Sequence, residues 1–221
     1  MSAFCKLAKL AELEELLAAD PLVQVEFPLI VGDRLSSLHS YPLYSALKSL
    51  EPWLEECPTV LINSIAGVLL HNKQIETHCN SQLQLRVPIS RASRLYALAG
   101  KRLSVGQGSI ALQPPTIRPL ISKKNLRSRF VTIKLRDYQG SNPPPDLFLA
   151  AANRQLQGMG VRGELSLILR RGEPKRQVIK IKGKFITGFA VEVKGLSEED
   201  SLKLQQFGLG GRKTMGGGWF E

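Results

Sequence analysis

The order in which apolar periodicity changes along the chain restricts its fold more than any other feature of the sequence. In the first half, alternating apolar residues indicate strands, and apolar residues three or four positions apart indicate helices. They follow one another as strand, helix, strand, strand, helix, strand. The predicted strands span residues 23–31, 60–70, 82–87 and 101–112, the predicted helices span residues 40–56 and 90–99, and another helix over residues 2–19 precedes them.

The second half repeats this order after a proline-containing linker at residues 114–126. The predicted strands span residues 127–135, 164–171 and 177–193, the predicted helices span residues 146–158 and 197–206, and Trp219 and Phe220 form a final strand. The strand at 177–193 becomes two strands if Lys182-Gly183-Lys184 turns a hairpin. Two successive β-α-β-β-α-β units predict an α+β chain of tandem ferredoxin-like (RRM-like) domains at residues 1–117 and 118–221.

Residue types at the helix ends support these assignments. Pro42 lies in the first turn of its helix, where a missing N–H costs nothing. Asp146 follows three prolines as the expected cap of its helix, and Ser197 with Asp200 forms a capping box. Gly208 is expected to end the last helix. A glycine-rich loop then separates this helix from the final strand.

The sequence of that loop and the final strand, FGLGGRKTMGGGWFE at residues 207–221, predicts an anion-binding backbone. Glycine adopts positive φ and allows a ligand to approach the main chain closely. We expect the loop amides to face an anion, with Arg212 and Lys213 as counter-charges. The alternative is a disordered basic tail, but such a tail has no use for Leu209, Trp219 and Phe220. The expected anion-facing amides are those of Gly208, Gly210, Gly211, Gly216, Gly217 and Gly218.

The charge of the chain is concentrated in its second part. The formal net charge is +11, and residues 1–85 hold five Lys or Arg against ten Asp or Glu, whereas residues 86–221 hold 25 against nine. This imbalance predicts a polyanionic partner, with nucleic acid as the leading candidate. Lys123, Lys124, Arg127 and Arg129 crowd the start of the second unit and predict contacts with an RNA backbone. A solvated charged surface is the alternative interpretation.

No metal ion or cofactor is expected. Cys5, Cys57 and Cys79 form no CxxC pair and are interpreted as reduced thiols. His71 and His78 lie near Cys79 without a recognised zinc-ligand spacing. The first twenty residues are amphipathic and charged, so we expect no signal peptide and a cytoplasmic protein.

Tandem ferredoxin-like units with a glycine-rich loop before the last strand resemble the repeat-associated mysterious protein superfamily. His39 directly before SYPLYSALKSL, together with GLSEEDSLKLQQFGLGG, is more narrowly similar to the Cas6 family of CRISPR RNA-processing endoribonucleases. This resemblance implies a prokaryotic protein that cleaves CRISPR precursor RNA without a metal ion, leaving 2′,3′-cyclic phosphate and 5′-hydroxyl ends. The implied partners are precursor and mature guide RNA, and other CRISPR effector subunits are further candidates.

The resemblance also implies roles for individual residues. His39 becomes the catalytic candidate, since the pKa of histidine suits proton transfer near neutral pH. Tyr41, Tyr44 and Lys48 lie nearby, but their spacing does not fix whether any of them assists. Glycines 208, 210, 211, 216 and 218 with Arg212 and Lys213 become RNA-binding candidates. A noncatalytic RNA-binding subunit of a CRISPR effector and a basic ribosomal or RNA-chaperone protein remain as alternatives.

Overall fold

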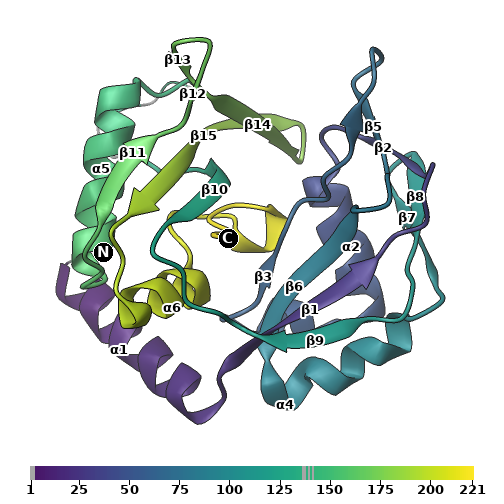
Figure 1. Cartoon of the computed structure of the whole chain (residues 1–221), viewed down its shortest axis with the longest axis horizontal. Coiled ribbons are helices and arrows are strands. Elements are labelled where there is room, and N and C mark those ends of the chain that lie inside the picture. Colours follow the sequence, from purple (N-terminus) through teal and green to yellow (C-terminus); the bar gives the residue numbers. More distant parts are fainter. Residues whose placement is uncertain (1–2, 136–137, 139, 141) are drawn as a thin grey trace.

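Two antiparallel sheets, one from each half of the chain, form the frame of the molecule (Figure 1). The computed structural model describes residues 3–135, 138, 140 and 142–221. The C-terminal segment runs through the middle of the molecule, between the two sheets (Figure 1). Helix α1 (Ala3–Ala19) confirms the predicted first helix and leads into the first sheet. The structure is therefore a mixed α+β fold with antiparallel sheets, as the sequence predicted.

The first sheet has the strand order β3-β6-β1-β9. Its central strands bury an apolar side, including Val25 and Phe27, against Leu43 and Leu47 of α2. The strands are β1 (Leu22–Pro28), β3 (Leu61–Ile62), β6 (Gln82–Pro88) and β9 (Thr116–Pro119). The helices are α2 (Ser40–Leu50), α3 (Trp53–Glu56), α4 (Ile89–Ala92) and the 3-10 helix η1 (Ser93–Leu98).

Several predictions in this half are wrong in detail. The predicted strand 101–112 is a separate hairpin of β7 (Arg102–Val105) and β8 (Gly108–Ala111), because Gly106, at φ +65°, turns the chain in its middle. The fourth strand of the sheet is β9, inside the predicted linker, where an edge position tolerates Pro119. Helix α2 ends before Pro52, since proline cannot donate to the preceding turn.

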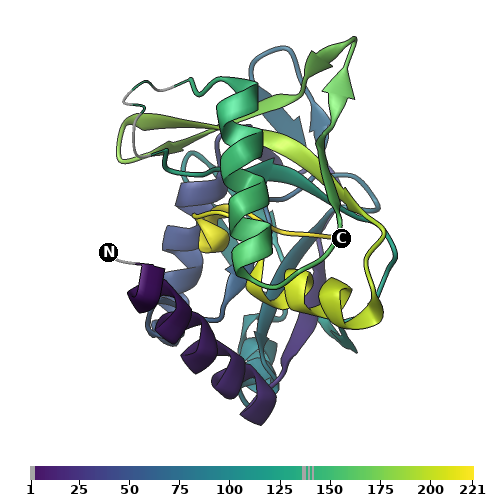
Figure 2. The ribbon, with the colours of Figure 1, turned by 90° about the vertical axis from the view of Figure 1, so that its left-hand side faces the viewer.

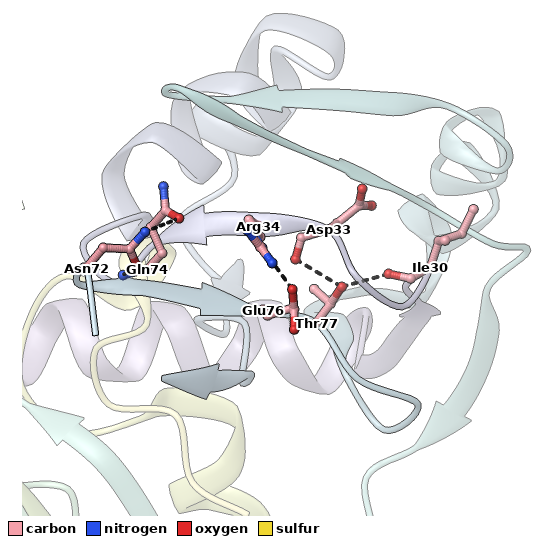
Figure 3. A network of polar contacts seen from close by, with 7 residues as sticks. All are labelled: Ile30, Asp33, Arg34, Asn72, Gln74, Glu76 and Thr77. Carbon is pink, nitrogen blue, oxygen red and sulfur yellow. Dashed lines mark hydrogen bonds and ion pairs between the residues drawn. The ribbon is translucent and has the colours of Figure 1, made fainter. Parts of the chain in front are cut away.

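The predicted strand 60–70 is also interrupted. Only β3 joins the first sheet, and β4 (Val68–Leu69) belongs to a small sheet of order β2-β5-β4 with β2 (Arg34–Ser36) and β5 (Gln74–Glu76). Figure 3 shows how polar contacts fix this small sheet: the Thr77 hydroxyl donates to the carbonyls of Ile30 and Asp33, and Arg34 pairs with Glu76 at 2.8 Å. The Ser37 N–H also donates to the Lys73 carbonyl at 2.9 Å, so the small sheet holds the start of the turn that leads into α2.

The second sheet has the order β10-β15-β11, and β14 pairs with the first part of β15. The alternative of a hairpin at Lys182-Gly183 is confirmed, because β14 and β15 meet there with both residues at positive φ. Helix α5 covers one face of this sheet (Figure 2). The elements of this half are β10 (Leu126–Val131), α5 (Pro145–Gly158), β11 (Glu164–Leu167), β12 (Leu169–Arg170), β13 (Glu173–Pro174), β14 (Arg176–Ile181), β15 (Lys184–Lys194) and α6 (Glu198–Phe207). Strands β12 and β13 form a separate two-stranded sheet.

The ends of the helices in this half confirm one sequence signal and correct another. The Ser197 hydroxyl accepts the backbone N–H of Asp200, as the capping box predicted. Asp146 is not the cap of α5, because the helix already begins at Pro145. In place of a final strand, Glu221 exchanges two backbone hydrogen bonds with Arg127 of β10, at 2.8 and 2.9 Å. The chain end thus lies beside β10 as a short extension of the sheet.

Arg86 joins the two halves from the side of β6 opposite Leu85 and Val87. It is 1% exposed, and its guanidinium donates to the carbonyls of Gln205 (2.8 Å) and Phe220 (2.7 Å) and to the side chain of Gln24 (3.1 Å). The guanidinium carbon also lies 3.9 Å from the centre of the Trp219 ring. Burial lowers the pKa of Arg86 to about 10, and the carboxylate of Glu221 acts in the opposite direction. The side chain therefore stays charged at neutral pH.

We predict that Arg86→Met lowers the free energy of unfolding by about 3–5 kcal/mol, because it leaves two buried carbonyls without donors. Urea unfolding followed by circular dichroism measures the change. As a control, Arg34→Ala removes an exposed ion pair and should cost about 1 kcal/mol or less. Equal losses for the two variants would contradict a special role for Arg86.

Candidate active site and glycine-rich loop

The glycine-rich loop is ordered, and its ends are buried. Leu209 and Phe220 are fully buried in the second core, and Trp219 packs with Phe207 and Leu61. The 3-10 helix η2 (Lys213–Met215) interrupts the loop. A disordered tail, the alternative that the sequence left open, is therefore wrong.

The loop amides are bonded within the protein and are not free to bind an anion, contrary to the prediction. Each of these N–H groups donates to an acceptor within the protein, at 2.8–3.0 Å. The acceptors are the carbonyls of Leu204, Thr132, Ile62, Arg212 and Phe130 and the side-chain oxygen of Gln155, for the amides of Gly208, Gly211, Gly216, Gly217, Gly218 and Gly210. Backbone donors in a packed loop find such partners because an unpaired buried N–H is costly. These glycine N–H groups therefore do not form a preformed anion-binding site.

The glycines instead allow the first and the last segment of the loop to pack closely against each other. A Cβ atom at Gly217 would lie 2.2 Å from the carbonyl oxygen of Gly211, and one at Gly218 would lie 2.3 Å from that of Leu209. Gly211 differs, because a Cβ there would meet nothing within 4 Å and the residue is exposed. The open side of the loop is thus at Gly211 and the neighbouring exposed Arg212. Lys213 is mostly covered, and burial lowers the pKa of its amine.

A pocket of about 310 Å³ opens where the two halves meet. One wall comes from the turn and start of α2 (residues 37–40) and from residues 64–67. The other wall comes from Arg129 and Phe130 of β10, residues 177–179 of β14, and Met215 and Gly216. Of the residues predicted from the sequence, His39, Arg129 and Gly216 therefore share one pocket.

His39 precedes the first turn of α2 and is 4% exposed. Its Nε2 accepts the backbone N–H of Ile65 at 3.0 Å, so the ring proton lies on Nδ1, which donates to the Ser36 carbonyl at 2.9 Å. Burial lowers the pKa of His39 to about 4, the positive charge of Arg129 lowers it further, and the Ser36 carbonyl opposes both. At neutral pH the imidazole is uncharged, and both of its nitrogens are engaged.

Arg129 crosses from β10 to the opposite wall. Its Nη2 donates to the Ser64 carbonyl at 2.5 Å and to the Asn63 side chain at 3.1 Å. The predicted cations Lys123, Lys124 and Arg127 are exposed but do not line the pocket, and Arg127 pairs with Glu192 at 2.8 Å. The structure thus separates the predicted basic cluster into one pocket residue and three surface residues.

Several polar residues of the pocket were not predicted. Ser40, Ser64 and Gln177 line it, whereas Tyr41, Tyr44 and Lys48 do not, and Lys48 pairs with Glu55 at 2.7 Å. The available signal was Asn63-Ser64, a polar pair inside the apolar stretch VLINSIAGVLL. Such a pair indicates an interruption of a strand rather than its continuation.

The remaining chemical candidates do not assemble a site. His71 is exposed, and His78 accepts the N–H of Asn80 within a turn. Across residues 3–135, 138, 140 and 142–221, no three His, Cys, Asp or Glu side chains are grouped to hold a metal ion. Cys57 and Cys79 are free thiols, and the side chain of Cys5 lies outside the described residues. In the same part of the chain, none of the helices combines the length and apolar character needed to span a membrane.

Comparisons of this chain with known proteins agree on one family. Residues 23–221 match the family described as Cas6 Crispr. The CRISPR-associated endonuclease Cas6 of Myxococcus xanthus (strain DK1622) is 32% identical over 198 residues, which cover 90% of this chain and 80% of that protein. This similarity extends over nearly the whole chain.

Solved structures share the fold at lower identity. A structure described as an RAMP protein binding different RNA substrates has a TM-score of 0.62 at 17% identity, over 90% of this chain and 98% of the other. A structure described as that of a Cas6-related gene from Pyrococcus furiosus has a TM-score of 0.61 at 15% identity, over 90% and 97%.

The low pKa of His39 predicts a pH-dependent stability. Between pH 6.5 and 4 the unfolded chain binds more protons at this residue than the folded protein does. The contribution of His39 to the free energy of unfolding is therefore fully present above about pH 6.5. It falls by about 3 kcal/mol as the pH drops to about 4. Chemical unfolding at a series of pH values should show this slope in the wild type and in His71→Gln but not in His39→Gln. An unchanged slope in His39→Gln would show that His39 is not the titrating group.

Proposed function

This chain belongs to the Cas6 family, and we propose that it is an endoribonuclease that binds CRISPR repeat RNA and cuts precursor CRISPR RNA into guide units. The observation that carries the proposal is the pocket between the two halves, where His39 and Arg129 come from opposite walls. The similarity to an endonuclease of this family over most of the chain supports it. So does the fold shared with an RAMP protein that binds RNA.

The proposed reaction is an attack of a ribose 2′-hydroxyl on the adjacent phosphorus. The new 2′-O–P bond forms as the P–O5′ bond breaks, which leaves a 2′,3′-cyclic phosphate and a 5′-hydroxyl. The 2′ proton passes to a base, and the departing 5′ oxygen takes a proton from water. His39 is already in its basic, uncharged form, and Nε2 is its proton-accepting nitrogen. Arg129 supplies positive charge for the pentavalent phosphate.

We assign RNA binding to the basic surfaces that flank this pocket. Arg212 is exposed at the open side of the loop, and Lys123, Lys124 and Arg127 are exposed where the chain enters β10. Gly208, Gly210, Gly211, Gly216 and Gly218 would act by shaping the loop rather than by offering free amides, since their N–H groups are bonded. The partners are precursor and mature guide RNA, with other effector subunits as further candidates, in a prokaryotic cytoplasm.

We interpret the two halves as tandem ferredoxin-like units. The first sheet carries its β-α-β-β-α-β elements in the order β3-β6-β1-β9. The second sheet has the order β11-β15-β10, which would match the first sheet with Glu221 beside β10 as the fourth strand. The predicted domain boundary after residue 117 cuts β9, so we place the boundary between Pro119 and Leu126.

A noncatalytic RNA-binding subunit is the second candidate, and one observation favours it. Both nitrogens of His39 are occupied, and its pKa of about 4 makes it a weak base in the free protein. Under this alternative, His39 only joins the turn before α2 to residues 64–67. The pocket would then hold RNA without cutting it.

Cleavage assays separate these candidates. With repeat RNA and excess chelator, we expect the wild type to cut once per repeat and His39→Ala to be slower by about 10²–10⁴-fold, the range of a lost acid–base group. His71→Ala, which changes an exposed histidine, should cut at the wild-type rate. Intact RNA in the wild-type reaction would exclude the nuclease, and undiminished cutting by His39→Ala would exclude the assigned base.

Salt dependence of binding tests the loop cations. The double variant Arg212→Ala, Lys213→Ala should bind repeat RNA more weakly, and the slope of log K against log salt should fall by about 1 for each phosphate that the protein no longer neutralises. Because Arg212 is the more exposed of the two, Arg212→Ala alone should account for most of the change. Lys101→Ala, at an exposed position of the first half, is the control. An unchanged slope in the double variant would assign both side chains to ordinary surface charge.

A further inference from the structure

One peptide group lies between Arg129 and His39. The Ser64 carbonyl accepts from Arg129 at 2.5 Å, and the N–H of the same peptide, on Ile65, donates to His39 Nε2 at 3.0 Å. Resonance links the two ends of a peptide, so charge drawn onto the oxygen makes the N–H a stronger donor. Arg129 therefore strengthens the bond that occupies the reactive nitrogen of His39.

The imidazole cannot turn away from this bond at no cost. Its other nitrogen donates to the Ser36 carbonyl in the turn that the small sheet fixes, and the ring is 4% exposed. Rotation of the ring would break both hydrogen bonds in a buried place. In the free protein, Nε2 therefore stays bonded to the Ile65 N–H and does not face the open space of the pocket.

A phosphate of bound RNA would be a stronger hydrogen-bonding partner for Arg129 than its present partners are. Both of its hydrogen bonds use Nη2 and end on uncharged oxygens. Within the described residues Nε and Nη1 have no hydrogen-bonding partner, so these donors are free for a phosphate. A phosphate forms charge-assisted and bidentate bonds with guanidinium, which are stronger than bonds to a neutral carbonyl.

We propose that Arg129 is a positioning residue that couples RNA binding to the release of His39. In the free protein it clamps the Ser64–Ile65 peptide onto Nε2, and a backbone phosphate that draws the guanidinium away loosens this clamp. Nε2 then becomes accessible to a 2′-hydroxyl. This inference rests on the proposed function, but its first step, the clamp, belongs to the RNA-free protein and can be tested there.

The electrostatics of the pocket support the same coupling. Arg129 on β10 is the only charged side chain in the described part of the chain that shifts the pKa of His39. Helix α2 and two elements packed against it, β14 and η2, carry the further cations Lys48, Lys180 and Lys213, none of which lines the pocket. A phosphate on Arg129 would neutralise its charge and weaken the Ile65 donor at once. Both changes raise the basicity of His39.

Nitrogen NMR of histidine-labelled protein tests the proposal. In the free wild type we expect the Nδ1–H tautomer and titration near pH 4. Arg129→Met should raise the pKa of His39 and weaken the Ile65 bond to Nε2. Arg129→Lys should restore part of the wild-type behaviour. Arg127→Met, on the same strand but exposed and paired with Glu192, should leave the pKa of His39 unchanged.

The second arm adds RNA to the wild type. The ligand is repeat RNA with a 2′-deoxy nucleotide at the mapped cleavage position, or the intact repeat if no cleavage occurs. We expect the pKa of His39 to rise by one unit or more on binding. If Arg129→Met does not fold, this arm decides alone. A pKa that stays near 4 with RNA bound, or in folded Arg129→Met, overturns the coupling. If the RNA is not cleaved but the pKa of His39 still rises on RNA binding, only the proposed function is contradicted.

Discussion

The charged side chain of Arg86, buried between the two sheets, fixes how the halves of the molecule meet. A guanidinium removed from water costs several kcal/mol unless its donors find acceptors in good geometry. Here the acceptors are carbonyls at the end of α6 and at Phe220, and the Trp219 ring lies against the guanidinium. Few relative placements of the sheets satisfy these contacts together. The apolar cluster of Leu17, Leu22, Leu61, Phe207 and Trp219 surrounds the same junction.

This junction also fixes the site. With Gln205 and Phe220 both held by Arg86, the glycine-rich loop is anchored at each end. The amide of Gly216 can then reach Ile62. Arg129, on the strand beside Glu221, can likewise reach Ser64 on the opposite wall. The pocket is therefore a consequence of how the halves dock, and no local segment could form it alone.

Local signals in the sequence predicted what is local in the structure. The positions of the main helices, the Ser197 capping box, the Lys182-Gly183 turn and the place of His39 before a helix all depend on neighbours in the chain. The amides of the loop were misassigned because their acceptors, such as Thr132 and Ile62, lie in distant strands. Arg86 gave no local signal, since a charged residue in an alternating strand normally faces water. Strand β9 was assigned to the linker because it ends in Pro119 and follows Pro114 and Pro115, although an edge strand tolerates proline.

The burial of His39 bears on how such a site could discriminate among RNAs. A histidine that is uncharged and bonded through both nitrogens is a poor catalyst toward any RNA that merely touches the surface. Under the proposed coupling, Nε2 of His39 is released only when a phosphate of the RNA backbone binds Arg129. Part of the binding energy of a correctly placed RNA then goes into activating His39. Discrimination would then lie in the rate of cutting more than in affinity. The basic second half could bind many RNAs, and the pocket would select those whose backbone reaches Arg129.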